Sequence, residues 1–329
     1  MSGANNTSMN NAMRAKNDEF YTQRVDIENE MQHYENHFKG KVVYYNCDDP
    51  RESSFFHYFS YNFEQLGLKK LIAACYKSNN ATLFSQGNSK KAAYQTYTGD
   101  KNENRQPDDE EITVKYFKDD GDFRSGESIK LLKEADIVVT NPPFSLFREY
   151  IAQLIEYKKK FIVIGNYNAV KYKNIWPLIK DNNLWLGTSA SGMEFRVSDK
   201  ATNFSREADG KKFTKLGMVI WFTNLTHKKR NRKMILVENY KKASYPKYDN
   251  FDAIEVAKTK DIPMDYPGMM GVPITFLSKY NPKQFEIIGM DVDLTKEKTG
   301  KVSYFYINGE KQYARIIIRN KDLQKGAKT

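Results

Sequence analysis

Short apolar runs recur along the first two thirds of the chain, and amphipathic or polar stretches separate them. Such runs are rich in β-branched and aromatic residues and have the length of one buried strand, as at residues 41–46, 70–76, 137–139 and 161–165. Between the last two, apolar side chains follow at helical spacing. Strands this apolar are typical of a sheet that helices cover on both faces. The pattern therefore predicts an α/β fold with a parallel sheet.

Outside these runs the composition of the chain changes, and these changes indicate where its domains begin and end. Residues 1–16 are rich in Asn, Ser and Gly and predict a disordered N-terminal arm. The polar residues 77–110 predict a hairpin or a flexible insertion. After a strong strand that ends at Phe222, short strands alternate with loops that contain Pro and Gly. We therefore assign residues 17–222 to a main domain and residues 223–329 to a smaller C-terminal lobe, whose last strands we expect to close against the main sheet.

The apolar run at 137–139 ends abruptly in the elbow Asn141-Pro142-Pro143-Phe144. Both prolines fix φ, and Pro143 also keeps the residue before it out of the helical region, so the chain must leave the sheet in an extended conformation. A helix and the next strand follow. In such units ligands bind at the carboxyl ends of the strands, which is where the elbow is predicted to lie.

The residue types of the elbow suit the activation of an amine attached to an aromatic ring. The lone pair of such an amine is delocalised into the ring, so the amine attacks electrophiles poorly until acceptors take its hydrogens. Asn141 offers a side-chain carbonyl, Pro142 a backbone carbonyl, and Phe144 a flat face for stacking. Rigidly held acceptors need no metal for this chemistry. The alternative interpretation is a proline-rich turn with a core phenylalanine.

The overall charge points to a polyanionic partner. The 329-residue chain has 52 Lys and Arg against 41 Asp and Glu, a net charge of +11. Neutralising phosphates releases counterions, so such a surplus favours nucleic acid. The basic residues concentrate after the main domain in Lys228, Lys229, Arg230, Arg232 and Lys233. This run is interpreted as a phosphate-contacting patch, with a solvated face as the alternative.

Other features limit the class of protein. No apolar run approaches the roughly 20 residues needed to span a membrane, and residues 1–17 lack the apolar centre of a secretory signal. Cys47 and Cys75 lie in strand-like runs without zinc spacing. We therefore expect a cytoplasmic protein with reduced thiols, no metal site and no membrane partner.

Several segments, taken in order, resemble the EcoRI-type adenine-specific DNA methyltransferases. They are NDEFYTQ at 17–23, VVYYNCDDPRES at 42–53, LGLKKLIAACY at 66–76, GDFRS at 121–125, NPPFSLFREY at 141–150 and MGVPITFLSKYNPKQFEIIG at 270–289. The elbow alone also matches amino-methyltransferases that act on cytosine or on glutamine amides. The resemblance covers nearly the whole chain.

The resemblance implies a Rossmann-like sheet with a C-terminal target-recognition lobe. It also implies transfer of a methyl group from S-adenosylmethionine to N6 of an adenine rotated out of double-stranded DNA. Such an enzyme belongs to a restriction-modification pair or acts alone in a phage or plasmid, and a monomer is expected. The implied catalytic residues are Asn141, Pro142, Pro143 and Phe144. The implied cofactor residues are Tyr21, Thr22, Asn46, Asp48, Pro50, Cys75, Tyr76, Asp122, Phe123 and Asn141.

The chain departs from methyltransferases in general in its first cofactor motif. The Gly-rich turn is replaced by residues 46–50, and no acidic residue ends the second strand. Three alternatives stay open at this point. The enzyme acts on RNA, it acts on a protein glutamine, or the chain is a DNA-binding relative that has lost catalysis.

Overall fold

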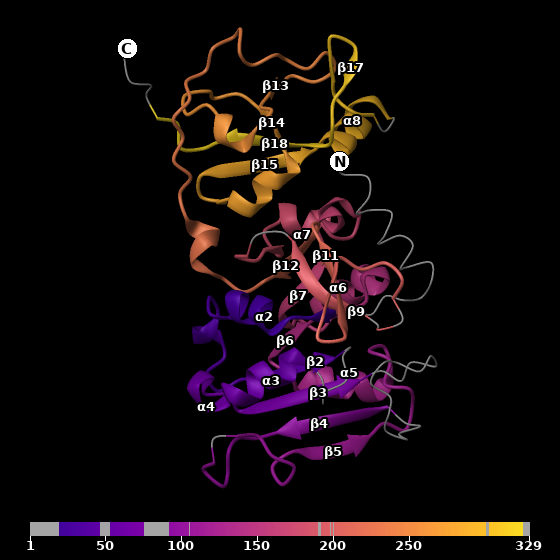
Figure 1. Cartoon of the computed structure of the whole chain (residues 1–329). Helices are drawn as coiled ribbons and strands as arrows, with labels where there is room; N and C mark the ends of the chain where they lie inside the picture. Colours follow the sequence, from indigo (N-terminus) through magenta and orange to yellow (C-terminus); the bar gives the residue numbers. More distant parts are fainter. Residues whose placement is uncertain are drawn as a thin grey trace. The chain divides into compact units, whose positions relative to one another are not determined.

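The computed structural model describes residues 20–46, 53–75, 92–104, 106–189, 192–197, 199, 201–300 and 303–324. The chain forms two compact units, which are described separately. The first comprises residues up to 177 together with 184–225, and the second comprises 178–183 together with residues from 226 onward. In Figure 1 the first unit runs from indigo to pink, and most of the second is orange to yellow.

An eight-stranded mixed sheet forms the centre of the first unit (Figure 1). Its order is β5 (Thr113–Tyr116), β4 (Ala93–Tyr97), β3 (Lys70–Cys75), β2 (Val42–Asn46), β6 (Ile137–Thr140), β7 (Lys160–Asn166), β12 (Val219–Thr223) and β8 (Trp185–Leu186). The four central strands, β3, β2, β6 and β7, are parallel, and the outer strands pair antiparallel. The predicted α/β class is confirmed.

Helices pack on both faces of this sheet. Alternate side chains such as Tyr45 join a cluster with Phe55 and Phe59 of α3. On the other face, Phe147 of α6 lies against Phe222 of β12, with ring centroids 5.0 Å apart. The helices of the unit are α2 (Arg24–Met31), α3 (Ser54–Tyr61), α4 (Phe63–Leu66), α5 (Gly126–Glu134) and α6 (Phe147–Glu156), with 3₁₀ helices η1 (Glu35–His37), η2 (Phe144–Leu146) and η3 (Tyr167–Lys171). Helix α7 (Trp176–Lys180) begins in this unit, and its residues from 178 onward are grouped with the second.

Local sequence signals explain where two of these helices begin. The Ser53 hydroxyl accepts a hydrogen bond from the backbone N–H of Phe55 at the start of α3, and Ser125 caps α5 through Ser128. A serine cap of this kind stabilises a helix by about 1 kcal/mol. Burial of α3 against the sheet adds more, because each fully buried aromatic side chain is worth roughly 1.5–3 kcal/mol.

The segment 77–110, predicted as a hairpin or flexible insertion, contributes a strand to the main sheet. Within it, β4 pairs antiparallel with β3 and with β5, so Ala93–Tyr97 is part of the sheet. The reason is aromatic packing, since the Tyr97 ring lies 5.0 Å from that of Phe63. Residues 76–91 lie outside the described residues.

A second sheet in the first unit joins segments far apart in the sequence. Its order is β1 (Tyr21–Thr22), β9 (Met193–Val197), β11 (Lys211–Leu216) and β10 (Arg206–Ala208). The apolar pattern predicts no strand in this polar region. Only alternate residues of β9 (Met193, Phe195 and Val197) are buried, and they face the core cluster that also contains Phe20.

The second unit has its own sheet, in the order β13 (Ile254–Glu255), β14 (Met270–Pro273), β18 (Arg315–Asn320) and β15 (Phe285–Met290). The last strands thus pair within this unit, and the expectation that they close against the main sheet stays a prediction. The final strand β18 pairs with β14 on one side and β15 on the other, so both of its edges are already used. Around this sheet lie α8 (Asp291–Thr299), the hairpin β16 (Tyr306–Ile307) and β17 (Glu310–Lys311), and 3₁₀ helices η4 (Lys228–Asn231), η5 (Thr259–Asp261) and η6 (Ile274–Lys279).

The sheet of the second unit carries a buried ion pair. Arg315 of β18 binds both carboxylate oxygens of Glu255 in β13, with a closest separation of 2.6 Å between Nη2 and Oε1. The Tyr248 hydroxyl also donates to this carboxylate.

The described part of the chain has no helix long and apolar enough to cross a membrane.

Candidate active site

The order of the central strands reverses between β2 and β6, because the chain passes from β2 outward to β3 and later returns to the other side of β2. In an open α/β sheet, ligands bind at the carboxyl edge of such a reversal. The residues at that edge are Asn46, which ends β2, and the elbow that follows Thr140 of β6. Thr140 donates its hydroxyl hydrogen to the Asn46 carbonyl, so the ends of the two strands are linked directly.

The side chain of Asn46 is also held in place. It is buried, and its Oδ1 accepts a hydrogen bond from the hydroxyl of Tyr150 in α6. The predicted cofactor residue at the end of the first strand is thus tied to the helix that follows the elbow. Two other residues predicted for this motif, Asp48 and Pro50, lie outside the described residues.

The structure fixes the orientation of Asn141 at the elbow. Asn141 is 7% exposed, and its Nδ2 donates to the backbone carbonyl of Phe20 at 2.6 Å. Since the amide nitrogen is directed to Phe20, the Oδ1 acceptor is turned the opposite way. A hydrogen-bond acceptor fixed in this manner is what an incoming amine requires.

The residues after Asn141 turn sharply into helix. Pro143 is extended (φ −52°, ψ 127°), and its carbonyl accepts from the backbone N–H of Leu146, which closes the 3₁₀ turn η2. Phe144 begins this turn and is buried, with its ring 5.7 Å from that of Phe20. Phe144 is therefore part of an aromatic cluster at the elbow as well as a candidate stacking surface.

The N-terminal segment lies over the elbow and is anchored from two sides. Its strand β1 pairs with β9, where Tyr21 is opposite Arg196 and Thr22 is opposite Phe195. Further along, the buried carboxylate of Glu30 accepts hydrogen bonds from the backbone N–H groups of Thr188 and Ser189, both at 2.7 Å. The segment that the sequence predicts as a cofactor loop is thus held beside Asn141.

The hydroxyl of Thr22 in β1 has an unusual environment. The hydroxyl of Thr22 is buried, and none of the described residues forms a hydrogen bond with it. Leaving such a group unsatisfied costs about 1–3 kcal/mol. A buried, unpartnered hydroxyl next to the elbow is a position at which a bound ligand would supply the missing partner.

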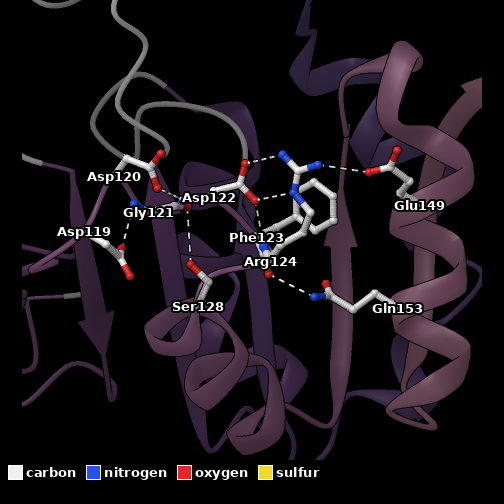
Figure 2. Close-up of polar contacts among 9 residues, drawn as sticks. All are labelled: Asp119, Asp120, Gly121, Asp122, Phe123, Arg124, Ser128, Glu149 and Gln153. Carbon is white, nitrogen blue, oxygen red and sulfur yellow. Dashed lines mark hydrogen bonds and ion pairs between the residues drawn. The ribbon is translucent and has the colours of Figure 1, made fainter.

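A turn rich in Asp lies beside the end of β3. Gly121 has φ +72°, and a Cβ there would stand 3.0 Å from the carbonyl oxygen of Cys75, so glycine allows this close approach. Asp119 and Asp120 stabilise the turn by accepting from the backbone N–H groups of Gly121 (2.9 Å) and Asp122 (3.0 Å), as Figure 2 shows. Tyr76 lies outside the described residues.

Arg124 binds the carboxylate of Asp122 in this turn. Its Nη2 lies 2.7 Å from Oδ2, and both its Nε and its backbone N–H donate to Oδ1 at 2.8 Å. These hydrogen bonds lower the pKa of Asp122 below its usual value, so the group is ionised at neutral pH. The next residue, Phe123, is buried and packs edge-on against Tyr150 with centroids 5.2 Å apart.

Sequence reasoning missed several residues that build this site. They are Phe20, which orients Asn141, and the residues that hold the Asp122 turn: Arg124, Glu149, Tyr150 and Gln153. No pattern in the sequence identifies the Phe20 carbonyl, because a backbone acceptor leaves no compositional signal. The helical spacing of 149, 150 and 153 does place these three residues on one face of α6.

The five basic residues from 228 to 233 occupy different environments. Lys228, Lys229 and Arg232 are exposed, whereas Lys233 is paired with Asp322 at 2.5 Å. Arg230 is buried, its Nη2 donates to Asn182 at 2.7 Å, and burial lowers its pKa to about 10. Arg230 thus binds protein groups within the second unit, which does not fit the predicted contact with phosphate.

These features together define an α/β enzyme with a rigid acceptor and an ionised carboxylate at the carboxyl edge of its sheet. The sequence matches the family described as "Adenine-specific methyltransferase EcoRI" over residues 8–321. It is 49% identical to the Type II methyltransferase M.EcoRI of Escherichia coli over 98% of this chain and 99% of that protein. It is also 39% identical to the Type II methyltransferase M.MpnI of Mycoplasma pneumoniae over 95% of this chain and 98% of that protein.

The chain belongs to the EcoRI family of adenine-specific methyltransferases. This membership confirms both the resemblance and the predicted enzyme class, a site-specific adenine methyltransferase of DNA in restriction-modification. No solved structure matches the chain.

Proposed function

We propose that this enzyme transfers the methyl group of S-adenosylmethionine to N6 of an adenine rotated out of double-stranded DNA, at the carboxyl edge of a Rossmann-like sheet. The observation that carries the proposal is the orientation of Asn141, whose Nδ2 is held by the Phe20 carbonyl at 2.6 Å. The amide Oδ1 is then available to accept a hydrogen of the target amine.

The residues beside the elbow fit S-adenosylmethionine. That cofactor offers hydroxyl and amino hydrogens, which need acceptors, and a flat adenine ring, which needs an apolar neighbour. The ionised Asp122 is an acceptor, Phe123 is a buried ring, and the Thr22 hydroxyl lacks a partner among the described residues. Tyr21, Asn46 and Cys75 complete the described part of the set, and Asp48, Pro50 and Tyr76 stay predictions.

When bound, the cofactor supplies an electrophilic methyl group on a sulfonium centre. The protein must make the adenine amine a better nucleophile and hold it in line. We assign Asn141 Oδ1 and the Pro142 carbonyl as the two acceptors that draw the amine hydrogens away from the ring plane. Pro143 fixes the direction of the elbow, and Phe144 supports the ring of the base.

We assign DNA binding to the second unit. Lys228, Lys229 and Arg232 are exposed there and are suited to phosphate contacts. Lys233 would have to leave Asp322 to take part, and Arg230 is assigned to the fold of the unit instead. In the same unit Tyr313 is 86% exposed, an aromatic surface of the kind on which proteins stack unpaired bases.

The proposal is tested by incubating the purified protein with S-adenosylmethionine labelled in its methyl group and with duplex DNA, RNA and a glutamine-containing protein in parallel. We expect label only in the duplex, at N6 of adenine. Because of the family, an oligonucleotide containing GAATTC is the first substrate to test, with the sequence scrambled as a control. Label in RNA or protein would overturn the proposed substrate.

Two further measurements on the purified protein test the remaining expectations. If calorimetry detects no binding of S-adenosylmethionine, the chain is a DNA-binding relative without catalysis. We also expect a cytoplasmic monomer that methylates one strand at a time. A dimeric mass in solution at working concentration would contradict that expectation.

A further inference from the structure

Helix α6 follows the elbow through the 3₁₀ helix η2, and one of its faces carries three contacts to the Asp122 turn. Figure 2 shows two of them, those of Glu149 and Gln153. Glu149 accepts from Arg124, Tyr150 packs on Phe123, and Gln153 donates to the Phe123 carbonyl at 3.0 Å. Positions i, i+1 and i+4 share one side of a helix. The turn and the elbow are therefore connected through a single rigid element.

Arg124 is the central member of this connection. Its Nε and Nη2 bind the Asp122 carboxylate, while its Nη1 lies 3.0 Å from Oε2 of Glu149. The carbon at the centre of its guanidinium stands 5.1 Å from the centroid of the Phe123 ring. A planar group with donors pointing in several directions can make these contacts at once, whereas a lysine ammonium is a compact point charge.

The contacts of Arg124 leave Asp122 able to bind a ligand. A carboxylate offers about four acceptor positions over its two oxygens. In the structure Oδ1 accepts two N–H groups from Arg124 and Oδ2 accepts one. One acceptor position stays open on Oδ2 for a hydroxyl or amine hydrogen of a ligand. Arg124 therefore orients the carboxylate without occupying all of its acceptor positions.

We propose that Arg124 is a positioning residue for the methyl donor, which holds the Asp122 turn against the Glu149 face of α6. The inference rests on the proposed role of this turn in binding S-adenosylmethionine. The Arg124 side chain is 54% exposed, and Glu149 is 59% exposed. Exposed ion pairs contribute little to stability. Removing this ion pair should therefore lower the affinity for the cofactor and leave the free energy of unfolding nearly unchanged.

The test compares cofactor affinity in Arg124→Ala with that of the unmodified chain. We expect calorimetry with S-adenosylmethionine to give a Kd raised on the order of tenfold, the usual cost of losing a hydrogen bond to a charged group. At saturating cofactor, kcat should stay within about twofold of the unmodified value. Arg124→Lys should not restore affinity, because the ammonium cannot bind Asp122 and Glu149 in the same geometry.

The chain provides a matched control in Arg206. Its guanidinium likewise binds both oxygens of a carboxylate, that of Glu194, and lies over a ring, that of Phe213 at 4.1 Å. Arg206→Ala should leave the Kd for the cofactor unchanged. An equal loss of affinity in Arg206→Ala would show that the effect is not specific to the Asp122 turn and would overturn the proposal.

A second variant separates positioning by α6 from a purely local effect. Alone, Glu149→Gln should raise the Kd for S-adenosylmethionine. Added to Arg124→Ala, it should not change the Kd further, because Glu149 acts only through Arg124. Unchanged affinity in Arg124→Ala, with normal binding by the unmodified chain, would disprove the role of Arg124. Absence of binding by the unmodified chain would instead disprove the proposed cofactor site.

Discussion

At the scale of single residues, the proposed site depends on Asn141, whose amide nitrogen and oxygen are assigned different roles. The amide nitrogen of Asn141 is bound to the chain at Phe20, and its oxygen is proposed to face the substrate. Substitution of Asn141 is therefore expected to be poorly tolerated, because removing either the amide nitrogen or the amide oxygen changes the position of the other. The hydrogen bond also connects the N-terminal segment to the proposed catalytic centre.

The first prediction concerns Asn141→Ala. We expect methyl transfer to fall by at least about 100-fold, the loss seen when one preorganised hydrogen-bonding group is removed from an active site. The Kd for S-adenosylmethionine should stay within a few-fold of the value for the unmodified chain. Initial rates with labelled cofactor and calorimetry measure the two effects, and turnover at the normal rate would exclude Asn141 from the mechanism.

The second prediction concerns the unpartnered hydroxyl of Thr22. Thr22→Val keeps the shape of the side chain and removes a buried polar group, so the free energy of unfolding should stay the same or rise by about 1 kcal/mol. If the hydroxyl binds the cofactor, the Kd for S-adenosylmethionine should rise at the same time. Urea unfolding and calorimetry on one preparation provide both values. Higher stability with unchanged affinity would remove Thr22 from the cofactor site.

At the scale of secondary structure, the apolar pattern predicts the central strands well and the outer ones poorly. The runs at β2, β3, β6 and β7 are recognisable because both faces of these strands are buried. Strand β9 is buried at alternate positions only, and β11 only at Phe213 and Leu216. The two strands form by pairing with each other, and β9 also pairs with β1. Such long-range pairing leaves little signal in a short window of sequence.

The candidate site shows the same limit. The elbow and Asp122 are evident because prolines, glycine and acidic residues interrupt apolar runs. The roles of Arg124, Glu149 and Gln153 depend on how α6 is rotated against the Asp122 turn, which a sequence pattern does not specify. The environment of Arg230 could not be predicted either, since it depends on Asn182 and Tyr280, which are distant in the sequence.

The third prediction concerns the buried pair between β13 and β18. Glu255→Ala would leave Arg315 and the Tyr248 hydroxyl without their partner inside the second unit. The expected cost is about 3–5 kcal/mol, because an unpaired buried charge is left behind. Thermal unfolding should show a large loss of stability, while Glu286→Ala, which breaks the exposed pair with Arg319, should change little.

At the scale of the whole molecule, chemistry and charge are assigned to different units. The described residues that we assign to cofactor and target amine lie in the first unit, and the basic run lies in the second. Each unit has its own sheet and its own buried core. This division allows the two functions to be changed separately by mutation.

The fourth prediction concerns replacement of Lys228, Lys229 and Arg232 by Ala. If all three contact phosphates, the slope of log K against log salt should become less steep by about 2.7, at roughly 0.9 per contact. Cofactor affinity should not change. Exposed lysines at the amino edge of the main sheet, Lys39, Lys41 and Lys69, provide a control of equal charge. Equal slopes for both triple variants would return the basic run to the solvated-face interpretation.

The contact between Phe20 and Asn141 has a consequence for the order in which the enzyme matures. These residues are 121 positions apart, and the strand partner of β1 ends only at Val197. During synthesis, the proposed target site therefore cannot be completed until about three fifths of the chain, up to Val197, has left the ribosome. On refolding in a test tube, we expect recovery of turnover to lag behind pairing of β2 with β3, because Val42 and its partner Lys70 are much closer in the sequence and long-range contacts form more slowly.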